Sequence, residues 1–142
     1  MIVASACGGA SKPAPRAGDD TEEPPPRFAA ALRMREEAPD PEQDVPRTRI
    51  ELVLHAREGP SRTTDVGVFE GVCAQKHGGG RVLLRVQCWW AGPRAEIVVL
   101  RRGDTLVVER GPPTGELQVV ARVELPRDAV VEPILPAALR DL

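Results

Sequence analysis

The sequence predicts an all-β fold: a small antiparallel meander of about six strands, packed as a sandwich or a partly closed barrel. Apolar and polar residues alternate with a period of two in several segments between residues 48 and 126, which is typical of half-buried strands. Turns that contain glycine and proline separate these segments at short intervals. No helix of crossover length lies between them, so we expect antiparallel pairing and no parallel sheet.

Within this β domain, residues 48–126, the alternation places strands at residues 48–56, 66–73, 82–90, 96–100, 105–110 and 117–125. Gly67 and Gly71 are expected to mark a bulge that switches the phase of the second strand. Along residues 82–90 the even positions, including Cys88 and Trp90, share the core face. Trp89 and the other odd positions lie on the opposite face.

Residues 1–47 are predicted to be a disordered tether, because most of this region is rich in Gly, Pro and acidic residues and poor in branched apolar ones. Residues 27–38 differ: they are mainly Ala, Leu, Met, Arg and Glu, which are strong helix formers, and Pro39 follows them. We expect one short helix there, either a nascent helix in the linker or a docking segment. Residues 127–142 are expected to be a C-terminal tail that covers a sheet edge or trails off.

The chain has three cysteines, Cys7, Cys73 and Cys88. Cys73 and Cys88 flank the glycine turn at residues 78–80, so a hairpin there would bring the two thiols together. The resulting disulfide would close a loop of about 15 residues and contribute roughly 3 kcal/mol. It would require an oxidising compartment. The alternative is a pair of buried free thiols in a cytosolic protein.

The N-terminus carries a separate signal. Ala4-Ser5-Ala6-Cys7 resembles the processing site of bacterial lipoproteins, in which small residues precede a cysteine that becomes the lipidated first residue. Ala4 stands where Leu is commonest in that family, and only six residues precede Cys7, fewer than a signal segment needs. The resemblance therefore implies a start upstream of Met1, lipidation of Cys7 and sorting to the outer membrane, facing the periplasm or the surface. The alternative is a chance match in a cytoplasmic protein.

Composition and motifs argue against several classes of function. A net charge of −2 and 3% aromatic residues give neither the basic face nor the stacking platform of a nucleic-acid-binding protein. None of the serines (Ser5, Ser11, Ser61) lies in a nucleophile elbow, and no glycine-rich loop leads from a strand into a helix. We therefore expect neither an enzyme nor a cofactor.

Two further patterns have ordinary explanations. Cys73, His77, Cys88 and His55 are zinc-ligand types, but their spacing fits no zinc motif, so no metal site is predicted. Residues 102–104 spell Arg-Gly-Asp, an integrin-recognition tripeptide, yet a hairpin turn between apolar strands explains them.

Trp89 is the most informative single side chain. If the second face of its sheet is covered, Trp89 belongs to the core, and we favour that interpretation. If the face is open, Trp89 is a candidate contact for a partner. The leading hypothesis is a lipid-anchored cell-envelope protein whose disulfide-linked β domain binds or supports another envelope protein. The rivals are a soluble small-ligand-binding β-barrel, with a pocket near Trp89 and His55, and a cytosolic assembly subunit with free thiols.

Overall fold

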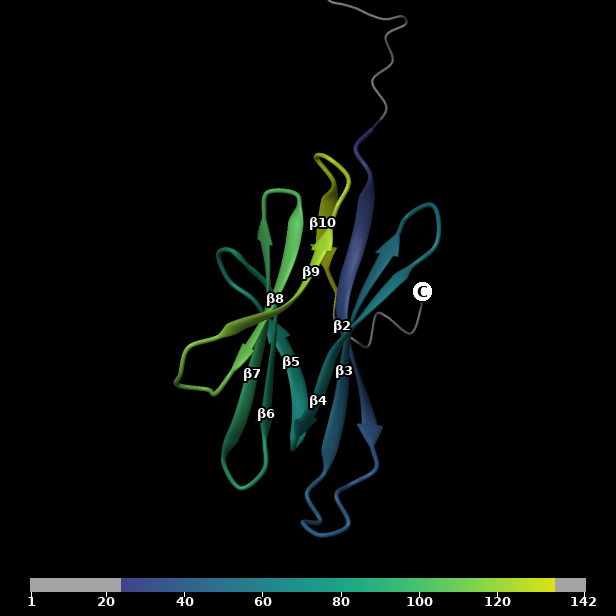
Figure 1. Ribbon diagram of the computed structural model, residues 1–142. Coiled ribbons are helices and arrows are strands. Elements are labelled where there is room, and N and C mark those ends of the chain that lie inside the picture. Colours follow the sequence, from purple (N-terminus) through teal and green to yellow (C-terminus); the bar gives the residue numbers. More distant parts are fainter. Residues whose placement is uncertain (1–23, 135–142) are drawn as a thin grey trace, which may run out of the picture.

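Two β-sheets packed face to face make up the computed structural model, which describes residues 24–134 (Figure 1). The first sheet has the order β10-β2-β3-β4, with β2 (Arg27–Glu37), β3 (Arg47–Ala56), β4 (Arg62–Glu70) and β10 (Val130–Pro133). The second has the order β5-β6-β7-β8-β9, with β5 (Val72–His77), β6 (Val82–Trp89), β7 (Pro93–Arg102), β8 (Thr105–Gly111) and β9 (Gln118–Glu124). The predicted all-β fold is confirmed: of the expected sandwich or partly closed barrel, the structure forms a sandwich whose sheets do not close into a barrel. Residues 24–134 form nine strands where about six were expected.

The prediction of a helix over residues 27–38 was wrong, because the structure forms strand β2 there. Ten consecutive residues of β2 pair in antiparallel register with β3. Ala30, Ala31 and Leu32 are fully buried. Helix propensity differs by only a few tenths of a kcal/mol among common residues, whereas burial and pairing in a sheet are worth more. The β domain therefore begins at residue 27 and not at residue 48.

Part of the C-terminal tail covers a sheet edge, which was one of its two expected placements, but it does so as a strand. Residues 130–133, assigned to the tail, form β10 and pair with β2 in parallel, so the exclusion of parallel pairing was wrong for this edge. The exclusion assumed a helical crossover between neighbouring strands, but here the first and last strands of the described domain meet after the whole sandwich has been traversed. The other pairs are antiparallel.

The core lies between the sheets and comes from alternate residues of both. The inward residues are each at most 8% exposed: Ala30, Leu32, Ile50, Leu52, Leu54, Val66 and Phe69 in the first sheet, and Leu84, Val86, Cys88, Ile97, Val99, Leu106, Val108 and Val123 in the second. The strand alternation seen in the sequence thus identifies most of the buried face.

The chain changes sheets between β4 and β5, at Gly71. The predicted phase switch is confirmed at Gly67, because a register shift lets both Val66 and Phe69 face the core. Gly71 itself has φ +104, and a Cβ there would lie 2.6 Å from the carbonyl oxygen of Trp89. Only glycine fits such a position.

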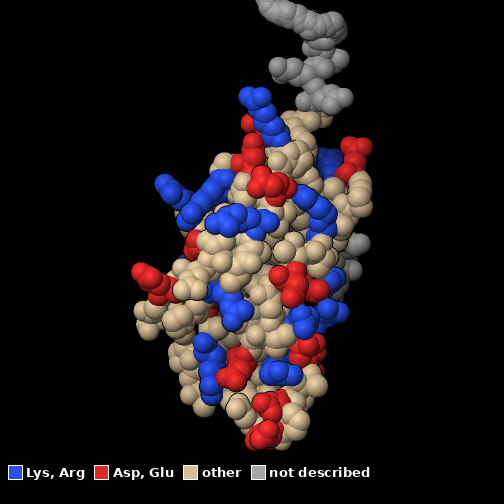
Figure 2. Space-filling view, in the orientation of Figure 1, with Lys and Arg blue, Asp and Glu red and all other residues tan. Residues whose placement is uncertain are grey.

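On the outer face of the first sheet, charged side chains form cross-strand pairs. Arg49 on β3 lies between Asp65 on β4 (2.9 Å) and Glu37 on β2 (3.3 Å). Hydrogen bonds to these two carboxylates raise the pKa of Arg49. Figure 2 shows acidic and basic side chains interspersed over the face in view, without a field of one sign.

Cys7, the tether over residues 8–23 and the tail beyond residue 134 lie outside the described residues. Between residues 24 and 134, no helix has the length and apolar character needed to cross a bilayer.

Candidate functional site

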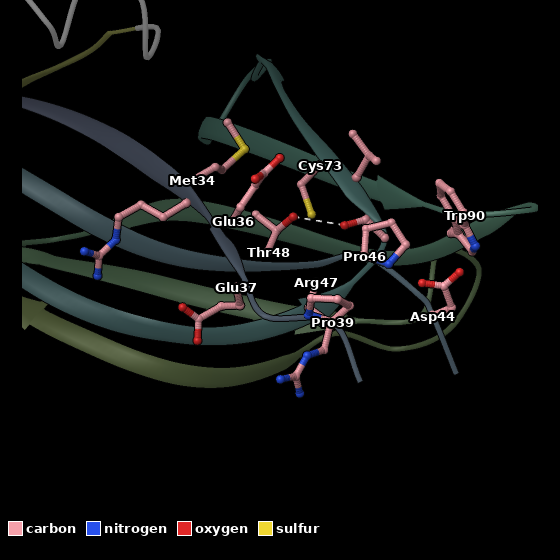
Figure 3. Close-up of a pocket in the computed structure, with 13 residues that line it drawn as sticks. Met34, Glu36, Glu37, Pro39, Asp44, Pro46, Arg47, Thr48, Cys73 and Trp90 are labelled. Atoms are coloured by element: carbon pink, nitrogen blue, oxygen red, sulfur yellow. Dashed lines mark hydrogen bonds between the residues drawn. The ribbon is translucent and has the colours of Figure 1, made fainter. Parts of the chain in front are cut away.

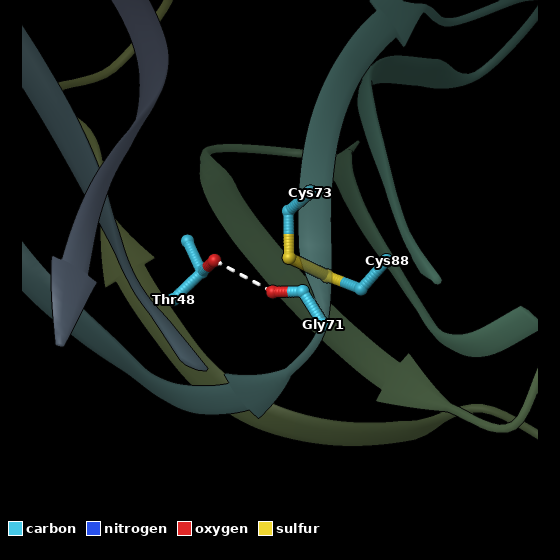
Figure 4. Close-up of a disulfide and its surroundings, with 4 residues drawn as sticks. All are labelled: Thr48, Gly71, Cys73 and Cys88. Atoms are coloured by element: carbon cyan, nitrogen blue, oxygen red, sulfur yellow. Dashed lines mark hydrogen bonds between the residues drawn. A yellow bond between two sulfur atoms is a disulfide. The ribbon is translucent and has the colours of Figure 1, made fainter. Parts of the chain in front are cut away.

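The predicted disulfide is present. Cys73 on β5 and Cys88 on β6 are directly opposite each other in the register, and their Sγ atoms are bonded at 2.04 Å. Cys88 is 1% exposed, whereas Cys73 is partly buried at the margin of the core. The bridge therefore lies where β5 starts, just after the chain changes sheets (Figure 4).

A hydrogen bond joins the two sheets at the same place. The Thr48 hydroxyl on β3 donates to the carbonyl of Gly71 at 2.9 Å (Figure 4), and the Gly71 N–H donates to the carbonyl of Pro46 at 2.7 Å. The start of β5 is thus held to the first sheet by these two hydrogen bonds and to β6 by the disulfide. This end of the sandwich is a rigid base for neighbouring side chains.

Both tryptophans are exposed, so the burial predicted for Trp90 and favoured for Trp89 was wrong. Trp89 is 44% exposed and Trp90 is 41% exposed. The register shifts between Cys88 and Trp89, and Ala91 and Gly92 then turn the chain with positive φ. Strict alternation therefore stops at Cys88, and Trp90 leaves the core face with the turn.

Val72, next to Cys73 in sequence, is a third exposed apolar side chain near the disulfide. It is 48% exposed and lies opposite Trp89 in the β5–β6 register. Three of the four exposed large apolar side chains in residues 24–134 are therefore Val72, Trp89 and Trp90, and the fourth is Val120 on β9. We call the first three the tryptophan surface.

Beside the tryptophan surface lie two open pockets. One, of about 400 Å³, is formed by Trp89 together with Pro93 and Ala95 on β7 and Pro113 in the β8–β9 connection. The other is a groove of about 530 Å³ between the ends of β2 and β3 and the start of β5. Figure 3 shows this groove, with Trp90 and Asp44 at one end, and Met34, Glu36, Thr48 and Cys73 around the rest.

One wall of the groove is the edge of β2 beyond Leu32, with which no strand of residues 24–134 pairs. Pairing of β10 with β2 ends at Ala30, after which the Ile134 N–H donates to the Ala30 carbonyl. At the next step the Gln75 side chain takes the place of a strand: its Oε1 accepts from the Leu32 N–H at 3.3 Å and its Nε2 donates to the Ile134 carbonyl at 2.8 Å. The Gln75 amide thus stands in for one peptide group and terminates the ladder.

The charges around the groove are not evenly paired. Arg35 forms an ion pair with Glu51 at 3.2 Å, the Arg47 side chain donates to the Ala38 carbonyl at 3.0 Å, and Glu37 pairs with Arg49. Glu36 and Asp44 form no ion pair with any residue between 24 and 134. The groove therefore offers two carboxylates to an incoming cation.

The structure does not bring His55 and Trp89 together, because they line no common pocket and His55 lies near the opposite end of β3 from the groove. Sequence reasoning missed the 2.6 Å hydrogen bond between Ser61 Oγ and His55 Nδ1. Both residues flank an exposed hairpin, and no carboxylate of the described residues hydrogen-bonds this ring. The arrangement therefore lacks the orienting acid of a catalytic triad.

The hairpin turn predicted at the Arg-Gly-Asp tripeptide is present. Arg102 ends β7 and Gly103 and Asp104 form the β7–β8 turn, as expected of a hairpin. Among the described side chains, which do not include that of His77, no three His, Cys, Asp or Glu groups lie closely enough to hold a metal ion. No protein-family model, curated protein sequence or solved structure matches this chain.

Proposed function

We propose that this protein is a binding module of the bacterial cell envelope, anchored by a lipid on Cys7, whose β-sandwich holds a partner protein through the tryptophan surface. The observation that carries the proposal is the exposure of Val72, Trp89 and Trp90 together on the rigid base formed by the disulfide. Tryptophan is enriched among the residues that dominate binding energy in protein interfaces.

Two features support the location outside the cytoplasm. A disulfide between neighbouring strands persists in an oxidising compartment and is rare in the cytosol. The residues Ala4-Ser5-Ala6 before Cys7 resemble the processing site that precedes the lipidated cysteine of bacterial lipoproteins. Stable attachment needs more than one acyl chain, which lipidation of the bacterial lipoprotein kind provides.

The anchor is tested in the native host by metabolic labelling with an alkyne analogue of palmitate, followed by fractionation. The wild-type chain is expected to carry the label and to sediment with membranes, and Cys7→Ser is expected to lose both. Label retained in Cys7→Ser, or no label in the wild type, would rule out the lipid anchor.

Binding is tested with a photo-crosslinking amino acid placed in turn at Trp89, Trp90 and Val120 in the same host. Val120 is the matched control, because it is 43% exposed and apolar but lies on β9. We expect one shared adduct from positions 89 and 90 and none from position 120. Equal crosslinking at all three sites, or none at any, would refute a dedicated tryptophan surface.

A further inference from the structure

Beyond Leu32, no residue between 24 and 134 fills the outer edge of β2 in the first sheet. Backbone groups of alternate residues in a strand point to the same side, and those of Ala30 and Leu32 point away from β3, toward β10 and Gln75. The β2–β3 register continues without a bulge to Glu37, so the N–H and C=O groups of Met34 and Glu36 also point outward. No hydrogen bond within residues 24–134 reaches them.

Within the described residues, β10 does not continue along this edge. The Gln75 amide occupies the position where the next peptide group of β10 would pair with Leu32. An in-register continuation would next place Pro136 beside the Leu32 carbonyl, and proline has no N–H to donate. Strand β10 thus ends at Pro133, and no described residue pairs with β2 beyond Leu32 on this side.

The side chains beside this edge indicate which side chains a partner strand would need. Met34 and Glu36 lie two residues apart and share the inner face of β2, so they are presented side by side at the mouth between the sheets. Met34 packs against the core and offers an apolar contact, with Trp90 on the same groove. Glu36 and Asp44 offer unpaired carboxylates.

We infer that the groove takes an extended segment of a partner polypeptide, added to the first sheet as a further strand on β2. Its backbone bonds to Met34 and Glu36, an apolar side chain contacts Met34 and Trp90, and a basic side chain two positions away reaches Glu36 and Asp44. Strand addition of this kind takes affinity from main-chain hydrogen bonds and specificity from alternate side chains. The inference rests on the proposed binding function and names the chemistry of its partner.

The test uses the full chain and three blocked eight-residue peptides. The first has the central sequence Val-Thr-Arg, the second has Val-Thr-Glu, and the third is the first with alternate backbone amides N-methylated on its pairing edge. Amide hydrogen exchange is followed residue by residue by NMR. The first peptide at saturation is expected to slow exchange of the Met34 and Glu36 amides at least about tenfold, and the third is expected to have no effect.

Two variants of Glu36 distinguish the contribution of the backbone hydrogen bond to peptide binding from the contribution of the side-chain charge. Glu36→Gln is expected to weaken binding of the first peptide about two- to fivefold, because exposed ion pairs are weak. Glu36→Pro also removes the outward N–H without breaking a β2–β3 bond, and is expected to weaken binding about tenfold. Unchanged far-ultraviolet circular dichroism and an unchanged midpoint of thermal unfolding verify that each variant is folded.

Each other outcome overturns the inference. Protection of Met34 and Glu36 in dilute protein without peptide means that residues 135–142 fill the edge. Protection that grows with protein concentration, together with a dimeric mass, means that a second copy does. Binding of the acidic and basic peptides with equal affinity excludes the charge recognition. If crosslinking at Trp89 and Trp90 succeeds while no peptide protects the β2 edge, the binding function stands and strand addition fails.

Discussion

Removing the Cys73–Cys88 disulfide is expected to cost a large part of the stability of the sandwich. The bridge spans 15 residues of sequence, so the chain-entropy relation assigns it about 3 kcal/mol. Cys88 is 1% exposed, and replacing it leaves a small cavity that costs about 1 kcal/mol more. The double variant Cys73→Ala/Cys88→Ala should therefore lose about 4 kcal/mol, against a total of about 5–15 kcal/mol for typical domains.

Urea unfolding followed by tryptophan fluorescence measures this loss, since Trp89 adjoins the bridge in sequence. With a slope of about 1–3 kcal/mol per molar urea, the midpoint should fall by about 1–4 M. All proteins carry Cys7→Ser, so that no free thiol can exchange with the bridge. Reduced wild-type domain is the control that isolates loop closure, and it should lose about 3 kcal/mol. A loss below about 1 kcal/mol in both samples would refute the assignment of stability to the disulfide.

Three further substitutions test the fold, each by the free energy of unfolding in urea. Gly71→Ala should cost about 2 kcal/mol or more, because φ is +104 and the new Cβ would meet a carbonyl oxygen at 2.6 Å. Gln75→Ala should cost about 1–3 kcal/mol, since it removes both hydrogen bonds that join β5 to β2 and to the residue after β10. Leu32→Ala should cost about 2–5 kcal/mol, because Leu32 is fully buried in the core.

Each of these three substitutions has a matched control or an outcome that would contradict its explanation. Gly79→Ala has no atom within 4 Å of its new Cβ and a φ outside the left-handed range, so it should change stability by less than about 0.5 kcal/mol. If Gly71→Ala lowers the free energy of unfolding no more than Gly79→Ala does, the close approach between residue 71 and the Trp89 carbonyl is contradicted. An effect of Gln75→Ala no larger than that of Gln87→Ala would mean that the amide bridge is not formed in solution. An unchanged free energy of unfolding in Leu32→Ala would contradict the assignment of residues 27–38 to the folded domain and would favour the linker interpretation.

The sequence predicted the parts of the fold that local patterns determine. Alternation over residues 82–90 identified Leu84, Val86 and Cys88 as core, and the glycine turn after β5 placed Cys73 opposite Cys88. A hairpin fixes the register of its two strands through its turn, so this pairing needs no information from elsewhere in the chain.

The features that the sequence did not predict depend on contacts between residues that are far apart in the chain. Strand β2 consists of residues that form helices well, and only its place between β3 and β10 decides the outcome. With four residues, β10 is too short to show a period. The exposure of Trp89 and Trp90 depends on a register shift in the β6–β7 pair, which alternation within one strand does not reveal. The groove needs both sheets and the end of β10, so no single segment indicates it.

The place of β2 at the entry of the domain governs how the module bears tension. The chain arrives from the N-terminal side at Arg27, and the proposed grip of the partner is near Glu36, close to the other end of the same strand. A pull between a membrane and a bound partner would then run through the backbone of β2 itself, and it would not shear the ten pairs that β2 forms with β3. The hydrogen bonds between β2 and the added strand carry the load instead, so the partner should detach before the sandwich is forced to unfold.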